Sequence, residues 1–162
     1  LTSTDAAAAQ RTIRTLVAGS EDSIPFIRKH LRPTISPVDV RAIAHFVADL
    51  DSDQFATREK ATEQLEKLGE LAEPALRDAL RGKPPLETRQ RIDRLLENLA
   101  AQRDNPSPER LRMLRVLEAL EYMDTPAARR ALEELAKGAP AADLTNEANA
   151  ALKRLALAAI ER

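Results

Sequence analysis

The chain has 162 residues and a formal net charge of −1, and its residues are 31% charged but only 2% aromatic. This length fits a single domain, and the near-zero net charge provides no general attraction to nucleic acid or to an anionic membrane. The absence of cysteine excludes disulfides, thiolate nucleophiles and cysteine-based zinc sites.

Apolar side chains recur at helical spacing along most of the chain, which predicts an all-α protein with about nine helices. Ala, Leu, Glu, Lys and Arg dominate the composition and favour helix, and no segment shows the alternation typical of a strand. In chain order, the predicted helices are 5–18, 22–31, 37–50, 53–68, 71–81, 86–102, 108–123, 126–137 and 144–161.

Glycine and proline mark the ends of these helices. Each glycine follows a helical pattern, where a left-handed conformation is common; the four are Gly19, Gly69, Gly82 and Gly138. Three prolines follow a hydroxyl residue that can cap a helix, at 36–37, 107–108 and 125–126. The connections are short, so successive helices should pack antiparallel. We expect the longer connection 103–107 to be a hinge within one domain rather than a domain boundary.

An internal repeat runs through the chain. The stretch SIPFIRKHLR (23–32) aligns without a gap with AEPALRDALR (72–81), and TPAARRALEEL (125–135) is a looser copy. Three helices in about 50 residues lie near the long end for HEAT and armadillo repeats, whose apolar edges are covered by stacking. We therefore predict a right-handed α-solenoid, a HEAT/armadillo-like superhelix. It would form one domain over 1–162, with units at about 1–34, 35–83 and 84–140 and a capping helix at 143–162.

Arg58 lies within the apolar stripe predicted for helix 53–68. The stripe otherwise holds Phe55, Ala61, Thr62, Leu65 and Leu68. An unpaired buried charge is costly, so we expect Arg58 to pair with Asp51 or Asp53 and to tie the preceding turn to the next. The alternative is an arginine that binds an anion.

Several longer stretches resemble phrases that recur in one group of proteins. They are IPFIRKHLRP (24–33), DSDQFATREKA (51–61), LEKLGELAEPALRDAL (65–80), PSPERLRMLRVLE (106–118) and TPAARRALEELAKGAP (125–140). Over about residues 1–155 the chain is similar to the α-helical region that follows WD-repeat β-propellers in large bacterial proteins of planctomycete type. The resemblance implies a HEAT-like solenoid that accompanies a propeller in a scaffold protein, and it transfers no catalytic residue.

The sequence predicts no catalytic, cofactor-binding or metal-binding residue. His30 and His45 have no ligand partner at metal spacing, and no phosphate-binding or nucleophile motif is present. We expect the acidic residues to form solvated helix faces with local ion pairs. The pairs expected are Glu63–Lys67, Glu87–Arg91 and Arg129–Glu133.

The short predicted helices 22–31, 71–81 and 126–137 carry a possible row of arginines. If these helices line the inner surface, the row is the candidate partner-binding site, because arginine binds carboxylate and phosphate bidentately. Its members are Arg28, Arg32, Arg77, Arg81, Arg129 and Arg130. The acidic residues among them, Asp78, Glu133 and Glu134, leave open a plain solvated face.

These features predict a non-catalytic protein–protein interaction or scaffolding module of a larger multidomain protein. The partner would be a propeller domain of the same parent chain or an acidic surface of another protein. One alternative is a nucleic-acid-binding, DNA-glycosylase-like HEAT protein, which the few aromatic residues and the net charge disfavour. Another is a structural spacer that packs on a propeller.

The sequence also bears on membranes and on the limits of the chain. No apolar run reaches the roughly 18 residues that a transmembrane helix needs, so we expect no membrane partner. The chain begins at Leu1 rather than Met and reads as a fragment of a longer protein. Absent targeting signals therefore carry little weight, and a cytoplasmic location is favoured only by default.

Overall fold

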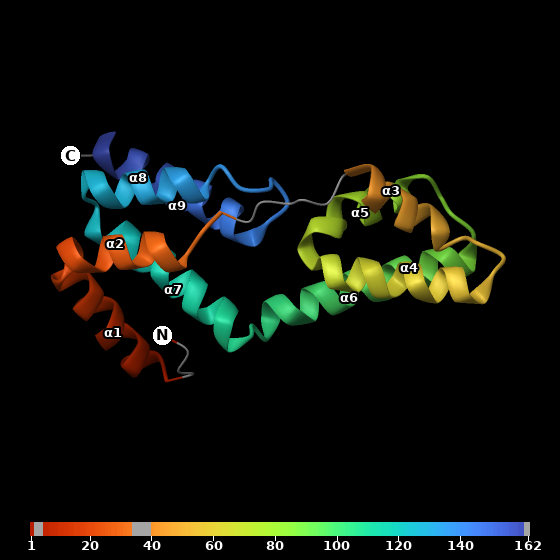
Figure 1. The fold of residues 1–162 in the computed structure, drawn as a ribbon, viewed down its shortest axis with the longest axis horizontal. Helices are drawn as coiled ribbons and strands as arrows, with labels where there is room; N and C mark the ends of the chain where they lie inside the picture. Colours follow the sequence, from red (N-terminus) through yellow and green to blue (C-terminus); the bar gives the residue numbers. More distant parts are fainter. Residues whose placement is uncertain (2–4, 34–39, 161–162) are drawn as a thin grey trace. The chain divides into compact units, whose positions relative to one another are not determined.

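The structure is a computed structural model that describes residue 1, residues 5–33 and residues 40–160. This described part is all-helical and contains no strand, which confirms the predicted fold class (Figure 1). A short 3-10 turn, η1 (Gly69–Ala72), joins α4 to α5. The α-helices are α1 (Ala6–Ala18), α2 (Ser20–His30), α3 (Val40–Asp49), α4 (Phe55–Leu68), α5 (Glu73–Arg81), α6 (Leu86–Asp104), α7 (Pro108–Met123), α8 (Pro126–Leu135) and α9 (Asp143–Ile160).

The predicted number of helices, nine, is one too high when a continuous helical run is counted once. Helix α4, the turn η1 and helix α5 follow one another without a break over 55–81, so the described residues form 8 helices. The superhelical stacking of a solenoid stays a prediction.

The tertiary contacts divide the chain into two compact units whose boundaries differ from those of the predicted repeats. Unit 1 combines 1–35 with 106–162, and unit 2 is 36–105. The segment 103–107, predicted as a hinge inside one domain, therefore contains a boundary between units. An apolar stripe shows which face of a helix is buried but not which helix covers it, so the local pattern does not reveal this grouping.

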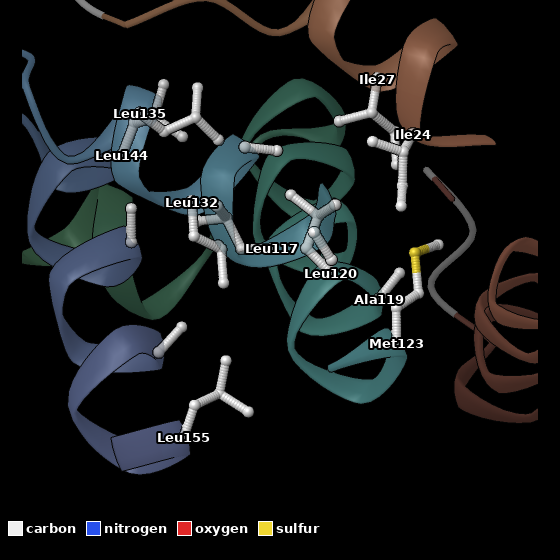
Figure 2. Packing of buried hydrophobic residues seen from close by; sticks show 14 of the residues in the cluster. Ile24, Ile27, Leu117, Ala119, Leu120, Met123, Leu132, Leu135, Leu144 and Leu155 are labelled. Carbon is white, nitrogen blue, oxygen red and sulfur yellow. The ribbon is translucent and has the colours of Figure 1, made fainter. Parts of the chain in front are cut away.

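In unit 1, the helix pair α1 and α2 packs on the helix pair α7 and α8. Helix α1 contacts α7 and α2 contacts α8, and Figure 1 shows each helix running beside its counterpart in the same direction. Helix α9 covers α7 and α8. The N-terminal helices thus complete a core built by the C-terminal ones (Figure 2). Its larger buried side chains are Ile13, Ile24, Ile27, Leu117, Leu120, Met123, Leu132, Leu135, Leu144 and Leu155.

Unit 2 has its own core, which shares no residue with that of unit 1. Helix α3 contacts α4 and α5, and α6 also contacts α4 and α5. Every helix of this unit thereby buries one apolar face, as amphipathic helices do. The buried residues are Ile43, Leu50, Ala61, Leu65, Ala72, Leu76, Ile92 and Leu95.

Two of the three predicted hydroxyl caps are confirmed. The Ser107 side chain accepts a hydrogen bond from the Arg110 amide, and Thr125 accepts one from the Ala128 amide, both at 3.2 Å. Each cap serves one of the free N–H groups at a helix start. The third predicted cap, at 36–37, lies outside the described residues.

A positive φ, which the predicted left-handed conformation requires, is present at one glycine. Gly69 has φ 55° and ψ −128°, a combination that side chains disfavour. Gly19 has φ −100° and Gly82 has φ −69°. Lys83, just beyond α5, and Asp124, at the end of α7, instead take positive φ angles of 54° and 44°. The prediction was therefore wrong for Gly19 and Gly82, which follow a helix but keep a negative φ.

Candidate functional site

Arg58 reaches the predicted turn but contacts different acceptors there. Its Nη1 donates hydrogen bonds to the backbone carbonyls of Ser52, at 2.7 Å, and Asp53, at 3.0 Å. Of the two predicted partners, Asp53 is thus contacted, but through its backbone carbonyl rather than its carboxylate. Carbonyls in a turn have no helical donor, and a half-buried guanidinium can satisfy two of them at once.

Phe55 does not belong to the inward stripe in which the sequence placed it. It is the first residue of α4 and its side chain is 68% exposed. Its ring lies 5.7 Å from the guanidinium carbon of Arg58, within the range of a cation–π contact. The ring thus covers part of the arginine that joins α4 to the preceding turn.

Asp51 binds a residue that the sequence did not single out. Its Oδ1 accepts a hydrogen bond of 2.5 Å from the Thr88 hydroxyl, which is buried in the first turn of α6. A hollow of about 530 Å³ lies between these elements and is also lined by Arg58 and Arg91. Its three acidic residues outnumber the two arginines, so this hollow shows no preference for an anion. The only feature of the sequence that could have indicated this contact was the position of Thr88 at the start of a helix.

The two row arginines of unit 2 are held by acidic neighbours. Arg77 donates to Glu73 at 2.7 and 2.9 Å, and Arg103 donates to the same carboxylate at 2.5 Å. The hydrogen bond from Arg103, with help from Arg77, holds the pKa of Glu73 below its ordinary value of 4.5. Arg81 contacts Asp78 at 2.6 Å on an exposed surface. Both arginines therefore have local partners in place.

In unit 1, Arg28 and Arg129 each bind a carboxylate. The contact of Arg28 joins helix α2 to helix α8. Arg28 of α2 binds Glu134 of α8 through two hydrogen bonds of 3.0 and 2.5 Å. Arg129 binds Asp124 at 2.8 Å instead of the predicted Glu133. The half-buried Arg129 thus points to the end of α7 and does not belong to the predicted row of arginines.

The other two predicted ion pairs, each within one helix, form as expected. The Lys67 ammonium lies 2.5 Å from Glu63, and Arg91 lies 3.4 Å from Glu87. Lys67 lowers the pKa of the Glu63 carboxyl through this hydrogen bond. These are exposed pairs on a helix surface, and such pairs contribute little to stability.

Three of the predicted arginines line one continuous surface, which we call the α2–α8 seam. A groove of about 680 Å³ lies between the first turns of α2 and α8 and includes Arg28 and Arg130. A second groove of about 180 Å³ lies between the later turns and includes Arg28 and Arg32. Arg28 belongs to both grooves, so the seam runs along the length of α2.

The complete row of six arginines stays a prediction. Arg77 and Arg81 belong to unit 2, whereas Arg28, Arg32, Arg129 and Arg130 belong to unit 1. The structure describes each unit by itself. Within unit 1 it joins Arg28, Arg32 and Arg130 and separates Arg129 from them.

A further groove of about 430 Å³ lies between α2 and α7. Phe26 lies at its edge with a 62% exposed side chain, and the His30 ring is 4.3 Å from the Phe26 ring. Sequence reasoning missed Phe26 as a surface residue. The signal was its place one residue before Ile27, outside the buried stripe of Ile24 and Ile27.

Neither a metal site nor a membrane span is present in the part of the chain that the structure describes. No three residues of the types His, Cys, Asp and Glu converge there as a metal site would require. His30 and His45 are both exposed. None of the helices there combines the length and the apolar character needed to cross a bilayer.

No family model, no curated protein and no solved structure matches the chain. The similarity to propeller-associated helical regions therefore remains a resemblance of sequence phrases. What the chain does has to be argued from its own surfaces, of which the α2–α8 seam is the most distinctive.

Proposed function

We propose that the chain is a non-catalytic module for protein–protein interaction within a larger scaffold protein. The observation that carries this proposal is the α2–α8 seam. Three arginines that the sequence separates, Arg28, Arg32 and Arg130, line one pair of grooves there. Arginine is enriched at protein interfaces, and its planar group binds carboxylates with defined geometry.

The packing of unit 1 supports the same function. Helices α2 and α8 lie side by side and pack on α1 and α7, so their outer faces form an extended surface. Stacked helix pairs create such surfaces without reactive groups. A partner can therefore bind along the helices, over an area larger than a small-molecule pocket.

The resemblance to propeller-associated regions adds a candidate partner. A β-propeller of the same parent chain would be held close to this module by the connecting polypeptide, which raises its effective concentration. A second protein would need a stronger surface to bind equally well. The module would then place the propeller or its ligands within the scaffold.

Panning a display library of random peptides against the 162-residue protein tests this function. Enriched peptides should share a motif and bind in solution by calorimetry, with a binding heat capacity that is negative because apolar surface is buried. If no motif is enriched, the chain acts as a spacer and the proposal fails. If instead duplex or single-stranded DNA binds at physiological salt, the nucleic-acid alternative replaces it.

A further inference from the structure

The α2–α8 seam combines free guanidinium groups with an apolar floor. Among the described residues, Arg32 and Arg130 contact no carboxylate, and both are exposed. Arg28, which lies between them along the seam, is already neutralised by Glu134. The first groove is also lined by Ile24 and by small or apolar side chains of both helices. The seam thus presents two unsatisfied cations, with the Arg28–Glu134 ion pair and apolar side chains of both helices between them.

A proline inside α2 adds a main-chain acceptor to this surface. Pro25 lies within the helix and has no N–H, so it cannot donate to the carbonyl of Glu21 one turn earlier. Both residues line the first groove. A polypeptide can offer a backbone N–H to such a carbonyl, whereas the phosphate–sugar backbone of DNA offers acceptors only.

The acidic residues of the seam also favour a peptide over a nucleic acid. Glu21 lines the first groove and Glu134 the second. A continuous run of phosphates would approach both carboxylates and be repelled by them. A peptide can place carboxylates beside Arg32 and Arg130 alone and pass the two glutamates with neutral residues.

We propose that the α2–α8 seam binds a short acidic segment of a partner protein, with one carboxylate on Arg130, one on Arg32 and an apolar side chain between them. This assignment rests on the proposed interaction function and specifies its partner. Helix α2 has 11 residues, which is roughly 16 Å at the helical rise. An extended segment of about five residues covers that distance.

Fluorescence anisotropy with two fluorescein-labelled peptides of about ten residues tests this assignment. In one peptide, glutamates flank a leucine–serine stretch; in its twin, glutamine replaces each glutamate. The acidic peptide should bind at low salt and weaken as salt is added, because the contacts are screened. The glutamine twin should bind at least about tenfold more weakly.

Charge reversal locates the binding site. The double variant Arg32→Glu/Arg130→Glu should weaken the acidic peptide about tenfold or more, since two attractions become repulsions. The matched control is Arg11→Glu/Arg14→Glu, which makes the same charge change at exposed positions of α1 in the same unit. It should leave binding within about twofold. Circular dichroism melts establish that both variants fold.

Three results would overturn the assignment. Equal losses of peptide affinity in the two double variants would show a general attraction to net charge. Equal affinity for the glutamine twin would show that the seam does not recognise carboxylates. Binding of a labelled single-stranded oligonucleotide that depends on Arg32 and Arg130 would assign the seam to nucleic acid. If display-selected peptides bind but ignore the charge reversal, the interaction function stands while this location of it is wrong.

Discussion

Truncation of Leu132 tests whether the two ends of the chain share one core. Leu132 of α8 is 0% exposed and belongs to the same buried cluster as Leu117 and Leu120 of α7 (Figure 2). The cluster also includes Ile13 of α1 and Ile24 of α2. Leu132→Ala should therefore weaken helices that lie at opposite ends of the sequence.

The size of the effect follows from the complete burial of the side chain. Leucine-to-alanine changes at fully buried sites cost about 3 to 5 kcal/mol, because transfer energy is lost and a cavity remains. Each 1.4 kcal/mol is a factor of ten in an equilibrium constant. A cost near 3 kcal/mol would thus raise the open population of unit 1 roughly hundredfold.

Hydrogen exchange measured by mass spectrometry resolves the effect by helix. Peptides from α1, α2, α7, α8 and α9 should exchange roughly a hundredfold faster in Leu132→Ala than in wild type. Peptides from α4 and α6 should change little, because unit 2 has a separate core. The reciprocal variant Leu76→Ala, at a 1% exposed residue of unit 2, should reverse the pattern.

Either of two outcomes would refute this reasoning. Uniform acceleration along the whole chain in both variants would mean that the two units open as one cooperative body. Acceleration of α7, α8 and α9 without α1 and α2 would mean that the N-terminal helices do not belong to unit 1.

Three further predictions concern polar contacts of unit 2. Arg58→Met should lower the free energy of unfolding by about 1 to 3 kcal/mol, measured with urea, because two carbonyls of the preceding turn lose their donor. Thr88→Val should lower it by about 1 kcal/mol, because the shape is kept while one hydrogen bond is lost. Glu73→Gln should be less stable than wild type near pH 7. The difference should vanish as pH falls below 4.5, because Arg103 and Arg77 depress the folded-state pKa of Glu73.

Each of these has a control that can contradict it. Display-selected peptides should bind Arg58→Met as they bind wild type; lost binding with unchanged stability would make Arg58 an anion-binding residue. Asp51→Ala removes the acceptor of the hydrogen bond whose donor Thr88→Val removes, and additive losses in the double variant would show that the two residues do not interact. A Glu73→Gln difference that grows on acidification would reverse the sign derived for the lowered pKa.

Helix positions could be predicted largely from the sequence. The predicted helix 108–123 coincides with α7, and 86–102 differs from α6 by two residues at its end. These helices are set by local terms, namely the spacing of apolar residues, the hydroxyl caps before proline and the high helix propensity of the composition. The repeat alignment was less informative. Pro74 lies in the first turn of α5, whereas the aligned Pro25 lies inside α2.

The candidate site was predictable in its residues but not in its contacts. Arg28, Arg32 and Arg130 were recognised from sequence, while the departure of Arg129 depends on Asp124, whose position follows the end of α7. The exposure of Phe55 and the carbonyl partners of Arg58 likewise depend on how a turn closes over the next helix. A helical wheel shows only the direction in which each side chain points around the helix axis. It cannot show which residue of another segment that side chain contacts.

The sequence by itself determined that this protein is helical, where most helices begin and end, and which face of each is buried. Those properties depend on neighbours along the chain within a few residues. Only the tertiary structure decided that α1 and α2 complete the core of α7, α8 and α9, and that α3 to α6 form a separate core. The choice among several similar apolar faces depends on how side chains from distant segments fit together, and amphipathic periodicity carries no information about that fit.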